Sequence, residues 1–169
     1  VYVYLPDNHS TQPEQNKNPR IVLDLRLRYL MSIGIIIFTA FALVQSITAF
    51  YIQDRFGLDL DRTAQTTALL LGTMALAAIV SQLTVVQRYK GSALNLIKFS
   101  VPLFVLSVIL IIFSPNFNLF YLGMALMGLG MGLASPGYTA SASLNADDQS
   151  QGAAVGMAMV APGIGFAIG

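Results

Sequence analysis

The sequence predicts an all-α protein, a polytopic bundle of about five transmembrane helices, and two observations carry this prediction. Of the 169 residues, 55% are hydrophobic and only 10% are charged, whereas a soluble domain carries roughly a quarter charged residues. The few charges fall into short clusters separated by long apolar stretches. In a bilayer such stretches must be helical, because open strands would leave backbone polar groups without partners.

Five apolar stretches define the expected spans, at 29–53, 63–87, 93–114, 117–144 and 152–169. A helix needs about 20 residues to cross roughly 30 Å of hydrocarbon. The third stretch is long enough if Lys98 extends its ammonium group to the interface. The last stretch is still apolar at Gly169, so we expect a truncated span in an internal piece of a longer chain.

The connections between these spans are short and contain capping and turn residues. Side-chain oxygens at such positions accept hydrogen bonds from the free N–H groups of a first helical turn. We expect Asp61 to cap the second span, Ser114-Pro115-Asn116 to form a tight turn, and Asn145 with Asp148 to form a capping box.

Positive charges predict the orientation of the bundle. Seven lie before the first span or near the connection of the second to the third, and two lie between the first and second. The seven are Lys17, Arg20, Arg26, Arg28, Arg88, Lys90 and Lys98, and the two are Arg55 and Arg62. Since cytoplasmic loops carry an excess of Lys and Arg, residues 1–28 are expected to be a cytoplasmic linker and residues 29–169 the transmembrane bundle.

The spans lack the groups that several classes of function need. The chain has no cysteine, and its one histidine, His9, lies in the linker. No Asp, Glu, Lys, Arg or His falls in the charge-free cores of the spans. Intramembrane hydrolysis and metal binding require such groups, so we expect no enzyme, no metal and no cofactor. The formal net charge of +1 indicates no nucleic-acid partner.

The first span combines small polar residues with one amide. Ser32, Thr39 and Ser46 recur every seven residues and form a stripe against which a neighbouring helix can pack closely. Gln45 differs, because an amide in hydrocarbon needs a partner, which can be another helix, a cavity water or a substrate. We therefore name Gln45 as a candidate cavity residue.

The fourth span carries two neighbouring faces at 100° per residue. Gly128 and Gly132 lie on a face of small residues that should pack against another helix in the manner of Gly-x-x-x-Gly. Met127, Met131 and Tyr138 lie on the adjacent face, which offers a soft lining for apolar ligands. The alternative for this second face is ordinary contact with lipid or core.

Six further residues, all proline or glycine, are candidates for helix packing or bending. Pro136-Gly137 is expected to interrupt the fourth span and Pro162-Gly163 the last, since a proline bends a helix or lets it bend. Such interruptions suit helices that must move, and they also occur in static bundles. Gly152 and Gly156 form another Gly-x-x-x-Gly spacing and are expected to serve helix packing.

Three segments resemble the C-terminal half of transporters of the major facilitator superfamily. The stretch that starts at Leu5-Pro6-Asp7 is similar to the central cytoplasmic loop of that family. The segment from Gly123 to Gly169 resembles its glycine-rich tenth helix, a short loop and the start of its eleventh helix. The segment from Ser81 to Gly91 is similar to the loop between the eighth and ninth helices of drug:proton antiporters, although the aspartate of that loop is missing.

This resemblance implies a partial second six-helix half of a twelve-helix transporter, in which the first and fourth spans line a central cavity. It adds support to Gln45, Met127, Met131 and Tyr138 as substrate-facing residues. The expected function is secondary active transport, with proton-coupled efflux of small amphipathic compounds by alternating access. The expected partners are the lipid bilayer of a bacterial inner membrane, a small-molecule substrate and the N-terminal half of the same chain. The alternative is a non-transporting membrane scaffold whose small-residue faces serve assembly.

Overall fold

The computed structural model describes residues 25–144 and 151–169. These residues form α1 (Leu25–Phe56), α2 (Leu60–Thr84), the 3-10 helix η1 (Val86–Arg88), α3 (Ala93–Ile112), α4 (Phe117–Leu144) and α5 (Gln151–Ile168). Within the described ranges α1 to α4 are long and apolar enough to cross a membrane, and the apolar stretch identified in α5, Met159–Ile168, is shorter. The predicted all-α membrane bundle is confirmed. Most of the linker and the pair Asn145 and Asp148 lie outside the described residues.

The start of α2 differs from the prediction. The N-cap is Asp59 and not Asp61, because the Asp59 carboxylate accepts a hydrogen bond from the N–H of Arg62 at 2.8 Å and the helix begins at Leu60. Asp61 lies in the first turn, where a negative charge is favourable beside the positive end of the helix dipole. The predicted span begins at residue 63, after the last charged residue Arg62, and is therefore three residues later than the observed start of the helix at Leu60.

The prolines do not end their helices. The helical backbone of α4 continues through Pro136, that of α5 through Pro162, and that of α3 through Pro102. The helical assignment is therefore continuous at Pro136-Gly137 and Pro162-Gly163, and their role as points of bending stays a prediction. A proline removes one backbone hydrogen bond, and transmembrane helices tolerate that loss when the surrounding helices compensate for it.

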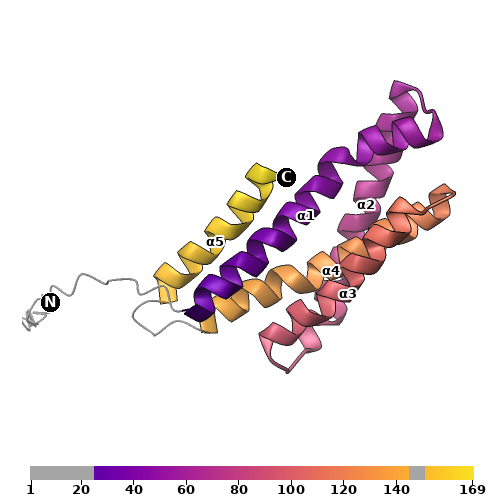
Figure 1. The fold of residues 1–169 in the computed structure, drawn as a ribbon. Helices are drawn as coiled ribbons and strands as arrows, with labels where there is room; N and C mark the ends of the chain where they lie inside the picture. Colours follow the sequence, from indigo (N-terminus) through magenta and orange to yellow (C-terminus); the bar gives the residue numbers. More distant parts are fainter. Residues whose placement is uncertain (1–24, 145–150) are drawn as a thin grey trace, which may run out of the picture.

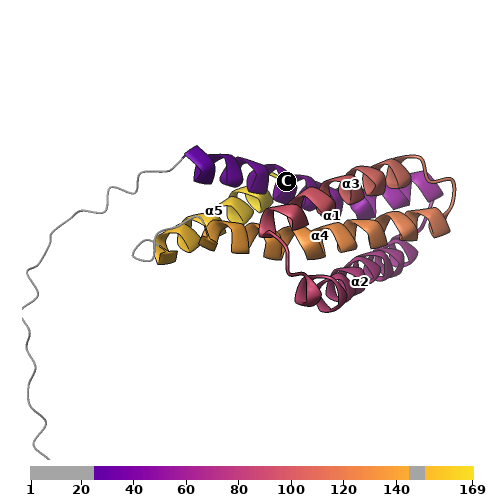
Figure 2. The same ribbon diagram turned by 90° about the horizontal axis from the view of Figure 1, so that it is seen from below.

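The helix α4 is the centre of the described bundle. Figure 1 shows α1 and α5 running side by side, with α4 passing beneath α1. In Figure 2 α4 lies between α3 and α2. The helices contact one another in two ways, by close approach of backbones at glycines and by packing of large side chains.

Three glycines of α4 face α3 at intervals of seven residues. A Cβ built at each glycine would lie close to a carbonyl oxygen of α3: Gly123 to Ser107 at 3.2 Å, Gly130 to Ser100 at 3.4 Å, and Gly137 to Ala93 at 3.0 Å. The partners in α3 also recur every seven residues, in reverse order, so the two antiparallel helices keep one register along their length. A repeat of seven is typical of left-handed helix packing, and small residues let the backbones approach.

The helix α2 contacts α4 at a second pair of glycines. A Cβ built at Gly128 would collide with the carbonyl oxygen of Met74, and one built at Gly132 would lie 2.6 Å from that of Ala78. Both pairs are offset by the same number of residues, so α2 and α4 run parallel. The hydroxyl of Ser81 adds a hydrogen bond to a carbonyl oxygen of α4 at 3.2 Å. These contacts fix α2, α3 and α4 to one another through their backbones.

The helix α5 packs against α1 in the same way. A Cβ built at Gly165 would lie 2.6 Å from the Cβ of Phe38, and one built at Gly169 would lie 2.7 Å from the carbonyl oxygen of Thr39. Phe166, between these glycines, places its ring 6.3 Å from that of Phe38 and 6.2 Å from that of Phe41. The described bundle therefore consists of two glycine-packed groups, α2–α3–α4 and α1–α5.

Large side chains fill the space between the two groups in two clusters. The first cluster is buried among α1, α2, α3 and α4, and the second joins one end of α1 to α3, α4 and α5. The buried members of the first are Phe41, Ile52, Leu70, Met74, Ile111, Phe120, Met124 and Met127. Those of the second are Leu30, Phe38, Ile97, Tyr138, Ala142 and Ala161. Met131 packs against both clusters.

Candidate functional site

The face of α4 that carries its methionines and Tyr138 lies between its two glycine faces. At 100° per residue, the glycines that meet α3 and those that meet α2 are separated by roughly half a turn, and the methionine face falls midway between them. This face therefore points to the large side chains of α1, and it supplies members of both hydrophobic clusters. It is one of the places where the two glycine-packed groups meet, and α4 also contacts α5 while α1 contacts α2.

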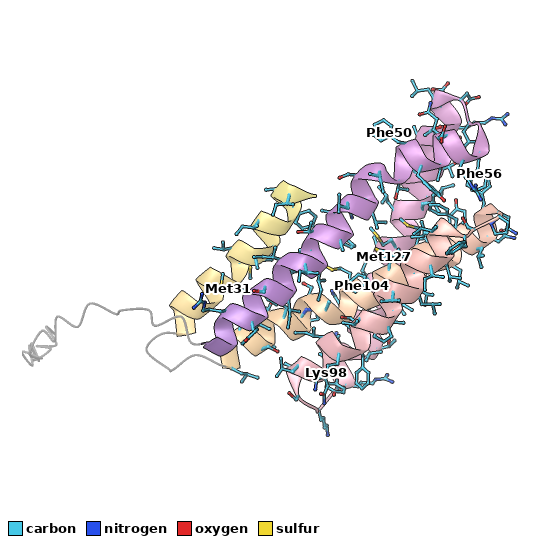
Figure 3. The ribbon with its side chains drawn as sticks, in the orientation of Figure 1. Met31, Phe50, Phe56, Lys98, Phe104 and Met127 are labelled. Carbon is cyan, nitrogen blue, oxygen red and sulfur yellow. The ribbon has the colours of Figure 1, made fainter. Side chains whose placement is uncertain are left out.

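Two of the methionines on this face are fully enclosed. Met127 is 1% exposed and Met124 has no exposed surface. Both pack in the first cluster with Phe41 of α1 and Met74 of α2, and Figure 3 shows Met127 among the side chains between the helices. In this arrangement of the helices Met127 therefore fills the core, and no open surface is available at its thioether.

Tyr138 is buried against the backbone of α1. Its ring lies over Gly34, where a built Cβ would be 2.5 Å from the ring carbon Cε2, and it meets the ring of Phe38 edge-on at 5.9 Å between centroids. The side chain is 3% exposed, and its hydroxyl has no hydrogen-bond partner among the described residues. A buried hydroxyl without a partner is costly, so the ring is held here by packing while its polar atom is available for a donor or acceptor.

Among the four candidate cavity residues, Gln45 and Met131 keep partly open surfaces, whereas Met127 and Tyr138 are buried. Gln45 and Met131 are each half-buried. Gln45 lies on the side of α1 that also carries Phe38 and Ala42, both buried, at helical spacings of seven and three residues. No hydrogen bond to its amide is found within the described part of the chain. Its position places a polar, unpartnered group at the edge of an apolar interior.

The candidate packing and hinge residues fall into three groups. Gly128, Gly132 and Gly137 lie at close helix contacts, as described above. Pro136 is half-buried inside the continuous α4, and Pro162 is half-buried inside α5. Gly156 and Gly163 are exposed with no atom within 4 Å of a built Cβ, so they pack against none of the described residues. The surroundings of Gly152 lie outside the described side chains.

Sequence reasoning missed the contact between α3 and α4. The repeat of seven in Ala93, Ser100 and Ser107, matched by the repeat in Gly123 and Gly130, was a signal that could have found it. It also missed a second feature, the hydrogen bond from the Tyr51 hydroxyl to the Ile112 carbonyl oxygen at 3.1 Å. That bond lies beside an apolar crevice of about 130 Å³ lined by Val44, Ile47, Thr48, Tyr51, Val108, Ile111, Ile112 and Phe120.

Comparison with known protein families decides the class of the molecule. The family model described as Major Facilitator Superfamily matches residues 1–169. The chain belongs to this superfamily. No curated protein and no solved structure matches the chain. The superfamily and the apolar helices together identify a multi-pass integral membrane protein that acts in transport.

Nowhere in residues 25–144 or 151–169 do three or more His, Cys, Asp or Glu residues gather as a possible metal site. Superfamily membership by itself indicates a transporter in preference to an enzyme.

Proposed function

We propose that this chain is part of a proton-coupled exporter of small amphipathic compounds that works by alternating access in a bacterial inner membrane. In this proposal residues 1–28 are a cytoplasmic linker, and residues 29–169 form part of the second six-helix half. An N-terminal half of the same protein completes the transporter and carries the proton-binding carboxylate. The seven-to-two distribution of Lys and Arg supports this orientation.

The observation that carries the proposal is the environment of Gln45. A half-buried amide without a described hydrogen-bond partner, on the same side of α1 as buried Phe38 and Ala42, offers one polar anchor in an apolar setting. Ligand sites are commonly built in this way, with a mostly apolar lining and a few polar groups that fix orientation. An amphipathic substrate has the complementary chemistry, with an apolar body and one or two polar atoms.

The packing of α4 supports a role for Met131 and Tyr138 in the same site. Both lie on the face of α4 that meets α1 through side chains. Methionine adapts its shape to different partners, and the unpartnered Tyr138 hydroxyl can bond to a substrate when the two helix groups separate. In alternating access, one bundle rocks against another around a central site.

Dye efflux from cells that express the complete natural gene tests the proposal. We expect lower accumulation than in empty cells, and we expect a protonophore to abolish the difference. Equal accumulation for a broad panel of amphipathic compounds would contradict efflux. Efflux that persists at full rate with the protonophore would contradict proton coupling alone.

A matched pair of substitutions tests the site. Gln45→Leu removes the half-buried amide, whereas Gln53→Leu removes an amide that is exposed on the same helix. We expect at least a tenfold loss of transport rate in Gln45→Leu at normal membrane abundance, and little change in Gln53→Leu. Equal rates in the two variants would show that Gln45 is not part of the site. Retained rates in both Gln45→Leu and Tyr138→Phe would instead favour a scaffold role for these helices.

A further inference from the structure

The connection between α2 and α3, together with the start of α3, carries a basic patch that we define as Arg88, Lys90 and Lys98. All three side chains are exposed. The ion pair found in the described chain joins Arg62 to Asp59 in a different loop, and the sequence has no acidic residue between Arg62 and Asp147. The charge of the patch is therefore not compensated by any neighbouring residue in sequence.

The fold places this patch at the membrane surface. The turn connects two helices that are each apolar enough to span a bilayer, so it lies where hydrocarbon gives way to head groups. Figure 3 shows Lys98 in the part of α3 next to this turn. Its neighbour Phe99 is 57% exposed, which fits a side chain in contact with acyl chains. A lysine at this depth extends its ammonium group toward the interface.

Tyr89 keeps the turn compact. A Cβ built at Gly91 would lie 2.5 Å from the Cζ and Oη atoms of Tyr89, so the ring folds back over the glycine backbone. Tyrosine is enriched at membrane interfaces because one end is apolar and the other is polar. With the ring in this position, Arg88 and Lys90 are held on either side of a half-buried anchor.

We propose that the patch binds the head groups of anionic phospholipids. Phosphodiesters match it in charge, since arginine binds phosphate oxygens through two parallel hydrogen bonds and lysine binds them as a point charge. The loop at the other end of α2 makes a useful contrast. It carries Asp54, Asp59 and Asp61 beside Arg55 and Arg62, so its charges offset one another and it offers no comparable attraction.

Quenching by brominated lipids measures this binding directly in the complete natural protein. Phe99→Trp introduces a fluorescent reporter next to Lys98, at a position that is exposed and already aromatic. The protein is placed in phosphatidylcholine bilayers that contain a small fraction of either dibrominated phosphatidylglycerol or dibrominated phosphatidylcholine. Both leaflets have the same composition, so the result does not depend on which way the loop faces.

We expect phosphatidylglycerol to be enriched about tenfold or more over phosphatidylcholine at this reporter. Combined Arg88→Gln, Lys90→Gln and Lys98→Gln should remove the enrichment, and Arg55→Gln with Arg62→Gln should keep it. Raising the salt concentration to about 0.5 M should also weaken it in the unsubstituted patch. Equal quenching by the two lipids, enrichment that survives the triple substitution, or loss in the control pair would each overturn the proposal. None of these outcomes depends on transport activity.

Discussion

The helix α4 makes two kinds of contact, and the difference between them separates what holds the bundle together from what is able to move. Toward α2 and α3 it presents glycines, so the helix backbones approach closely and little room is left for side chains at these points. Toward α1 it presents methionines and Tyr138, which pack against large side chains. Backbone contacts are rigid, whereas flexible side chains can repack between discrete arrangements. The proposed alternating access therefore favours motion of the α1–α5 group relative to the α2–α3–α4 group, since their contacts are made largely by side chains.

The largest expected effect comes from breaking the contact between α2 and α4. Gly128→Leu would force a side chain into the backbone of Met74, with no flexible group that can yield. We expect a loss of at least about 3 kcal/mol of stability and low membrane abundance. Thermal inactivation in detergent, followed by size-exclusion chromatography of the complete protein, measures this loss. Gly156→Leu is the matched control, because a Cβ there meets no atom within 4 Å; a similar loss in that control would contradict the assignment.

Alanine substitutions at two glycines that face α3 should differ in how much they destabilise the contact between α3 and α4. A Cβ at Gly137 would lie 2.9 Å from the Cβ of Leu96, whereas the closest contact at Gly130 is 3.4 Å. We therefore expect Gly137→Ala to destabilise the bundle by about 1–2 kcal/mol. Gly130→Ala should be nearly neutral, since alanine gains about 1 kcal/mol of helix propensity over glycine. The same detergent melting assay ranks the two, and the reverse order would show that the register of α3 on α4 is wrong.

At the interface between the two helix groups, we expect a second substitution to relieve the destabilisation that a first one causes. Gly34→Ala places a methyl group against the ring of Tyr138, and we expect a destabilisation of about 1 kcal/mol because an aromatic side chain can partly move away. Tyr138→Leu should remove the penalty of the added methyl, which gives a coupling energy of at least 0.5 kcal/mol. A double-mutant cycle of melting temperatures measures it, with Ser46→Ala in place of Gly34→Ala as the uncoupled control. Strictly additive effects would mean that the ring does not rest on Gly34.

The sequence was sufficient for the class of fold and for the ends of α4, because charge-free length and turn residues depend on local chemistry. It was not sufficient to predict which helices pack against each other. The spacing of Gly128 and Gly132 predicts that another helix packs closely against them, but it does not indicate that this helix is α2. Likewise the sequence makes Met127 and Gln45 equally good candidates for a cavity lining, but in the structure Met127 is buried and Gln45 is half-buried. Burial depends on which helices surround a residue, and that is a property of the packed bundle.

The smallest expected effect concerns the one hydrogen bond described between α1 and α3. The Tyr51 hydroxyl donates to the carbonyl oxygen of Ile112, the last residue of α3, where no residue further along that helix can satisfy it. Hydrogen bonds between transmembrane helices contribute about 0.6 kcal/mol on average, so Tyr51→Phe should lower the melting temperature slightly and leave the rest of the fold intact.

Tyr121→Phe is the matched control, because Tyr121 is also a half-buried tyrosine and makes no hydrogen bond with its side chain among the described residues. If both substitutions cost the same, the loss comes from the ring environment and not from the bond. If Tyr51→Phe costs several times more than expected, α1 is tied to α3 as firmly as α4 is, and α1 and α5 cannot move as a separate group.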